Sequence, residues 1–105
     1  MENTSIISET PVLQDNAASL RAGSTLLGST QPGFRGRICG IDARDVICAY
    51  TPSELERRLL EMGFVEGCTV EVLHQGTFNG DPIAVRVGPC TVALRRRDAM
   101  AIIVD

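Results

Sequence analysis

Apolar and polar residues alternate with the period of a β-strand in two neighbouring segments. In residues 68–73, Val70 and Val72 fall on one face, and Thr69 and Glu71 fall on the other. Residues 83–87 repeat the pattern, with isoleucine and two valines on the apolar face. Successive side chains of a strand point to opposite faces, so both segments are predicted to be half-buried strands. Asn79-Gly80 lies between them and tolerates the positive φ values of a tight hairpin, which predicts antiparallel pairing.

One segment has the spacing of an amphipathic helix. Thr51 is suited to cap the first exposed amides, Pro52 suits the first turn, and Glu54 completes a capping box. Gly63 supplies the stop. The apolar residues between these signals fall on one face at helical spacing: Leu55, Leu59 and Met62. We therefore expect one short helix that packs on the strands.

Four further runs are typical of short strands separated by Gly- and Pro-containing turns. They are residues 37–41, 46–49, 91–94 and 102–104, with Gly88-Pro89 as one turn and 98–100 as another. The pattern predicts a mainly β fold: a small closed β-barrel of about five strands with one short α-helix. Closure would remove vulnerable sheet edges.

The N-terminal third differs in composition from the rest of the chain. Residues 1–32 contain nine serines or threonines and only short apolar clusters, which offer little burial to offset the entropy of ordering. We expect 1–32 to be a flexible extension and 33–105 to be the compact domain.

The charge balance limits the classes of partner. The chain has a net charge of −3, and its thirteen acidic residues are distributed along it rather than gathered in a tail. A general nucleic-acid binder needs a basic footprint to displace counterions from phosphates. We therefore expect no nucleic-acid partner.

The apolar runs are too short for membrane insertion. None approaches the roughly 18 residues that a spanning helix requires, and Glu2 stands where a signal peptide carries positive charge. We expect a cytoplasmic protein whose four cysteines stay reduced.

The order of these signals resembles the FeoA family, the ferrous iron transport protein A group. The resemblance covers nearly all of residues 34–104. It is carried by Arg57–Phe64, which contains Leu-x-x-Met-Gly, and by Glu66–Val72, Gly80–Ile83, Val92–Arg96 and Ala99–Val104. The 32-residue leader and the four cysteines depart from the family pattern.

The resemblance implies an SH3-like β-barrel and an accessory role in ferrous iron uptake, with the membrane-bound permease FeoB as the partner. A similar module forms the C-terminal domain of metal-dependent repressors, so the fold alone does not settle the role. No helix-turn-helix segment precedes the module here, which favours the free-standing protein.

Candidates for partner contact lie on three segments. Arg57, Arg58 and Glu61 would be exposed on the helix if it faces the permease, although they are also ordinary surface charges. Phe78 at the hairpin tip either projects as an anchor or folds back over the barrel end. Arg95 and Arg96, within a run of three arginines, could meet an acidic surface or the phosphates of RNA; a solvated strand end is the alternative.

The alternative function is a transition-metal-binding or redox-sensing protein. The possible ligands are Cys39, Cys48, Cys68, Cys90 and His74. Zinc and iron–sulfur sites are usually marked by closely spaced cysteine pairs, and none is present. Buried structural thiols and a solvated loop histidine are therefore the favoured interpretation, with no cofactor. The sequence also shows no nucleophile–base pair or phosphate-binding glycine loop, so we expect a protein that is not an enzyme.

Overall fold

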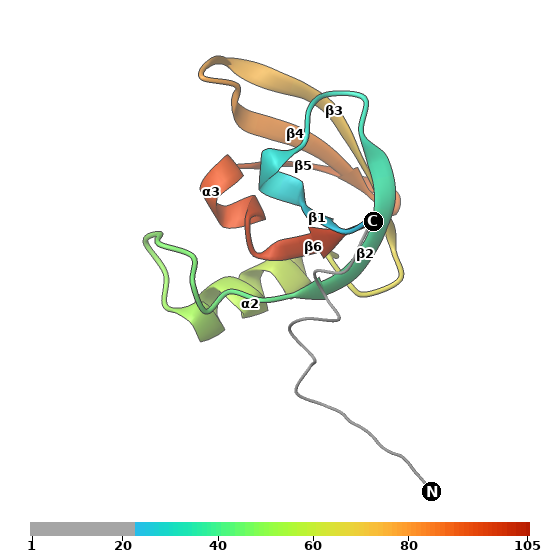
Figure 1. The fold of residues 1–105 in the computed structure, drawn as a ribbon. Helices are drawn as coiled ribbons and strands as arrows, with labels where there is room; N and C mark the ends of the chain where they lie inside the picture. The colour runs from blue at the N-terminus through green and yellow to red at the C-terminus, as the bar shows by residue number, and fades with distance from the viewer. Residues whose placement is uncertain (1–22) are drawn as a thin grey trace, which may run out of the picture.

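The computed structural model describes residues 23–105, which form a small, strongly curled sheet with one main helix (Figure 1). The elements in chain order are β1 (Thr25–Leu26), the 3-10 helix η1 (Leu27–Ser29), β2 (Arg35–Ile41), α2 (Pro52–Glu61), β3 (Thr69–Phe78), β4 (Asp81–Val87), β5 (Cys90–Leu94), α3 (Arg96–Ala99) and β6 (Ile102–Val104). The prediction of a mainly β fold with one principal helix is confirmed.

The sheet has six strands in the order β1-β6-β2-β3-β4-β5, and all neighbours are antiparallel. Strand β2 bends along one side of the molecule and connects the two halves of the sheet (Figure 1). Its register shifts between Ile38 and Gly40, which is the kind of irregularity that lets a sheet curl. The end strands β1 and β5 are not paired with each other. The sheet therefore curls like the expected small barrel and leaves a seam between these two strands.

The strand β1 lies in the segment that the sequence analysis placed in the flexible extension. Thr25 pairs with Val104 and Leu26 with Ile103, and the side chain of Leu27 is fully buried. Burial of one leucine contributes about 1.5–3 kcal/mol. The fold thus includes residues before Gly33, whereas residues 1–22 of the predicted extension lie outside the described part.

Two local predictions are wrong. Residues 46–49 form no strand, and Ile47 in that segment is 90% exposed. The segment belongs to a loop that follows β2 and has no neighbouring strand to pair with. The expected turn at 98–100 is instead the end of the short helix α3, in which the amides of Asp98 and Ala99 donate to the Arg95 carbonyl and the amide of Met100 donates to the Arg96 carbonyl.

The hairpin and the main helix form as their local sequences predict. Asn79 and Gly80 have φ values of 54° and 71° and connect the pair Phe78↔Asp81, as a tight hairpin turn requires. Thr51 and Glu54 form a reciprocal capping box at the start of α2. The pKa of the Glu54 carboxyl is lowered mainly by the hydrogen bond from the Thr51 backbone amide. The hydrogen bond with the Thr51 side chain lowers it further.

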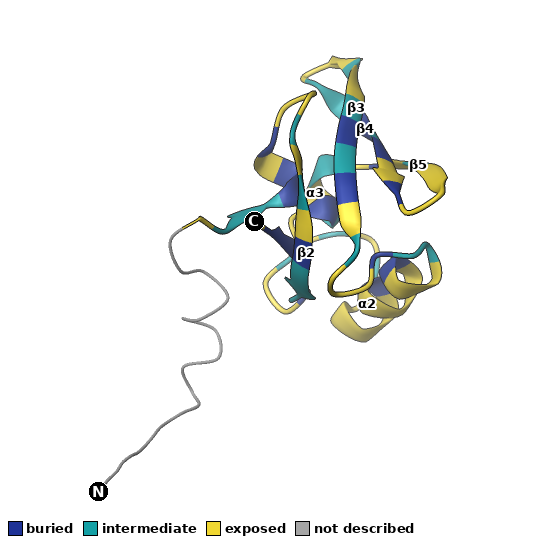
Figure 2. Cartoon of the chain, turned by 90° about the vertical axis from the view of Figure 1, so that its right-hand side faces the viewer, coloured by how far each residue is buried: buried dark blue, intermediate teal, exposed yellow. Residues whose placement is uncertain are grey.

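The core lies inside the curled sheet and extends under α2. Figure 2 shows the buried positions alternating along the strands, with α2 at the lower end of the molecule. The largest fully buried side chain is Phe64, which follows Gly63 at the end of the helix. Leu55 and Leu59 carry the buried face of α2. This packing fixes α2 next to the end of β5, where the candidate site lies.

Candidate partner-binding site

A cleft of about 220 Å³ lies between α2 and the end of β5. Figure 2 shows β5 at the outer edge of the sheet, with α2 below it. The apolar side chains that line the cleft are buried or half-buried and come mainly from Leu55, Leu59, Met62 and Leu94. The polar side chains around it are Tyr50, Arg58, Arg95, Arg97 and Asp98. An apolar lining with a basic border suits a peptide or protein surface that carries acidic groups.

The side chain of Arg58 is held at the cleft by an aromatic ring. Its guanidinium carbon lies 4.5 Å from the centre of the Tyr50 ring, a cation–π distance. Tyr50 directly precedes the helix cap, so the same backbone that starts α2 also positions the ring. Tyr50 was not among the predicted contact residues; its position directly before the capping box was the available signal.

The loop that carries Tyr50 is anchored at its start. The Asp42 amide donates to the Ala101 carbonyl at 2.8 Å, and the Arg44 side chain pairs with the Asp42 carboxylate at 2.8 Å. The side-chain hydrogen bond from Arg44 is the main cause that lowers the pKa of Asp42. This pair is solvent-exposed, so it orders the start of the loop more than it stabilises the fold.

The electrostatics of the cleft oppose those of the whole chain. Three arginines and one aspartate give the cleft lining a formal charge of +2, whereas the chain carries −3. The Oδ1 atom of Asp98 is buried and has no hydrogen-bond partner among the described residues. A buried acceptor of this kind is costly unless a donor reaches it. The groups that the cleft offers to an acidic ligand are therefore its guanidinium donors.

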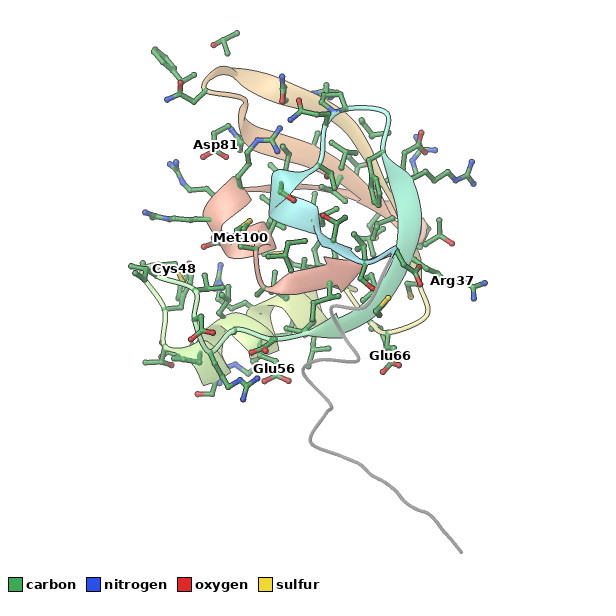
Figure 3. The ribbon with its side chains drawn as sticks, viewed as in Figure 1. Arg37, Cys48, Glu56, Glu66, Asp81 and Met100 are labelled. Carbon is green, nitrogen blue, oxygen red and sulfur yellow. The ribbon has the colours of Figure 1, made fainter. Side chains whose placement is uncertain are left out.

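Arg96, a predicted contact residue, is directed into the protein. Its side chain donates to the carbonyls of Gly80 at 2.7 Å, Thr30 at 2.6 Å and Gly28 at 3.1 Å, and also to Gln75 Oε1. Its backbone amide donates to an Asp81 carboxylate oxygen at 2.8 Å. Figure 3 shows Asp81 beside α3. Arg96 therefore links η1, the hairpin and α3, so its role is structural.

The other predicted contact residues do not form one surface. Arg58 and Arg95 come together in the cleft, whereas Arg57 and Glu61 are exposed on α2 but do not line it. Phe78 projects from the hairpin tip, where its side chain is 84% exposed. The outward orientation, rather than folding back, is the one that the structure adopts.

The predicted metal ligands are spread over the fold. Cys39 is in β2, Cys48 in the loop before α2, Cys68 just before β3, and Cys90 at the start of β5. His74 is exposed on β3. Figure 3 shows Cys48 on the opposite side of the molecule from Arg37 of β2. Within residues 23–105, no three cysteine, histidine or acidic side chains gather in a way that could hold a metal ion.

The cysteines are less buried than the sequence suggested. Cys48 and Cys68 pack against the core but are only half-buried, and Cys39 is also intermediate. Cys90 is exposed, so the prediction of a buried structural thiol is wrong there. Its position at the start of an edge strand explains the exposure.

Comparison with known proteins gives a family match over most of the described chain. Residues 25–105 match the FeoA domain. No curated protein matches the sequence. No helix within residues 23–105 has both the length and the apolar character needed to cross a membrane.

Solved structures share the fold. FeoA of Stenotrophomonas maltophilia, a prokaryotic SH3 domain protein solved in complex with zinc, is 27% identical with a TM-score of 0.63; the match covers 77% of this chain and 89% of that one. Iron(II) transport protein A of Clostridium thermocellum is 31% identical with a TM-score of 0.61, over 77% and 44% of the two chains. A manganese-dependent transcriptional repressor in complex with manganese has a TM-score of 0.63 at 23% identity, over 82% and 38%. The last likeness concerns the fold alone.

Proposed function

Because the chain belongs to the FeoA family, which is associated with ferrous iron transport, we propose that it is a cytoplasmic accessory protein of ferrous iron uptake. It acts by binding the cytoplasmic part of a FeoB-type permease. In this role it supplies a docking surface and catalyses no reaction. The observation that supports a docking role is the apolar cleft between α2 and β5 with its arginine border.

The cleft is suited to an acidic surface of the partner. Arg58 and Arg95 are exposed, and guanidinium groups form paired hydrogen bonds with carboxylates. Charges at the border of an interface mainly raise the association rate and fix orientation, while apolar contacts in the centre supply affinity. Phe78 lies outside the cleft and is a second exposed apolar side chain that a large partner could cover.

Co-purification tests the proposal. Tagged full-length protein, expressed in its own host under limiting iron, is expected to retain the FeoB-type permease, and deletion of the gene is expected to reduce ferrous uptake. The double variant Arg58→Glu/Arg95→Glu should lower permease recovery about tenfold, because two charge contacts become repulsive.

The control is the double variant Arg35→Glu/Arg37→Glu, which makes the same charge change on exposed side chains of β2. It should retain the permease. Equal recovery with both double variants, or normal ferrous uptake after deletion, would contradict the proposed function.

A further inference from the structure

Strand β5 has one backbone edge that pairs with no other strand within residues 23–105. It is the last strand in the sheet order, and its backbone is bonded only to β4 among the described strands. Edge strands in natural proteins are usually protected by charged residues, prolines or a covering element. The five residues Cys90–Leu94 contain neither a charge nor a proline. An edge of this composition is a template for an added strand.

The register identifies which backbone groups face outward. A two-residue turn, Gly88-Pro89, makes Val87↔Cys90 the first hydrogen-bonded pair of the β4–β5 ladder. Hydrogen-bonded and non-bonded pairs then alternate along the strands. The N–H and C=O groups of Thr91 and Ala93 therefore point to the free edge.

The free edge leads into the cleft. Ala93 and Leu94 are among the residues that line it, and Leu59 lines it from α2. A groove between an edge strand and a helix is the geometry in which an extended peptide adds a strand: main-chain hydrogen bonds supply affinity and side-chain pockets supply specificity. A strand laid along β5 would span roughly 17 Å, at about 3.3 Å per residue.

We propose that β5 receives an extended segment of the partner by β-strand addition, with an acidic side chain of that segment placed at the arginine border. This deepens the proposed function and rests on it for the identity of the partner as the permease. Arg95 directly follows β5, and Arg58 faces the same cleft from α2.

Charge favours an acidic protein segment over the other possible occupants. A second copy of β5 brings no acidic residue to the arginines, because Cys90–Leu94 contains none. RNA would supply phosphates, but a chain with net charge −3 repels it outside this small border. Residues 1–22 of the same chain do carry Glu2, Glu9 and Asp15, so they enter the test as a competing occupant.

NMR titration of isotope-labelled full-length protein tests strand addition directly. The probe is a capped peptide of about seven residues in which valine and glutamate alternate, a length and pattern that match one strand. Binding should shift the amide signals of β5 and α2 and slow hydrogen exchange at Thr91 and Ala93. A peptide alternating valine and lysine should not bind.

Two controls separate strand addition from simple charge attraction. The valine–glutamate peptide with methylated backbone nitrogens keeps its charges but loses its donors, and should bind about tenfold or more weakly. In the protein, Ala93→Pro removes an outward donor from an edge strand, where proline is tolerated, and should weaken binding similarly. Ala93→Val keeps that donor and should retain binding. Equal binding of the methylated and unmethylated peptides would overturn the proposal.

Other results would assign the groove to another occupant and also overturn the proposal. Peptide affinity that rises about tenfold in Glu2→Gln/Glu9→Gln/Asp15→Asn would identify the chain's own N-terminal segment. Shifts in β5 that depend on protein concentration without peptide would identify a second copy. Displacement of the peptide by an oligouridine RNA would identify nucleic acid.

The two proposals fail in different ways. Permease recovery that survives Ala93→Pro, together with no peptide response in β5, would reject strand addition and leave the proposed function in place. Peptide binding at β5 without any recovery of the permease would reject the proposed function and leave strand addition in place.

Discussion

Replacing Arg96 with alanine should cost a large share of the stability of the fold. The side chain donates to three backbone carbonyls at 2.6–3.1 Å and to Gln75 Oε1. Hydrogen bonds from a charged donor contribute about 1.5–3 kcal/mol each, but Arg96 is only half-buried, so water can replace part of this set. We expect a loss of about 3–4 kcal/mol, against a total stability of about 5–15 kcal/mol for a natural domain.

Thermal and denaturant unfolding followed by circular dichroism measure this change. For a domain of this size the expected loss lowers Tm by roughly 12–30 °C. Arg97→Ala is the matched control, because Arg97 is the adjacent arginine and is exposed; it should change stability by less than about 0.5 kcal/mol. Arg96→Lys keeps the charge without the planar fork and should fall between the two. An Arg96→Ala protein within about 1 kcal/mol of the wild type would refute the structural role of this side chain.

Four further changes test other parts of the account. Thr51→Ala removes the helix cap and should cost about 1 kcal/mol in denaturant unfolding, whereas an unchanged midpoint would contradict the capping role. Gly28→Ala places a Cβ against the backbone of α3 and the Met100 sulfur, so we expect about 1–3 kcal/mol of destabilisation by the same measurement. The lowered folded-state pKa of Asp42 means that its contribution is present above its usual value of 3.8 and is lost as the pH falls through the folded pKa; Asp42→Asn should flatten the acid side of a Tm-against-pH curve. Phe78→Ser should leave Tm unchanged within a few degrees, because the side chain is 84% exposed, and a large loss would show that the ring packs on the barrel.

The elements predicted from sequence are those whose signals are local. The capping box of Thr51 and Glu54 and the Asn79-Gly80 turn each depend on residues within a few positions, so their outcome did not depend on the rest of the fold. The strand β1 was missed because the strand that it pairs with, β6, lies at the other end of the chain. Residues 46–49 have strand-forming side chains, but no neighbouring strand was available to pair with them.

The candidate site was only partly predictable for the same reason. Charge and helix position identified Arg58 and Arg95 as surface residues, but nothing local indicates that they meet across one cleft. In sequence Arg96 cannot be told apart from the arginines on either side of it. Its acceptors Gly28 and Thr30 lie 68 and 66 positions away along the chain. The free edge of β5 likewise depends on the order of all the strands in the sheet, which no local pattern indicates.

Site-specific photo-crosslinking in cells shows whether the permease docks on the cleft between α2 and β5. A photoreactive phenylalanine analogue is placed at Tyr50, which lines the cleft, or at Arg37, which is exposed on β2. We expect a crosslink to the FeoB-type permease from position 50 and none from position 37. A permease crosslink from position 37 alone, or none from either position, would contradict it.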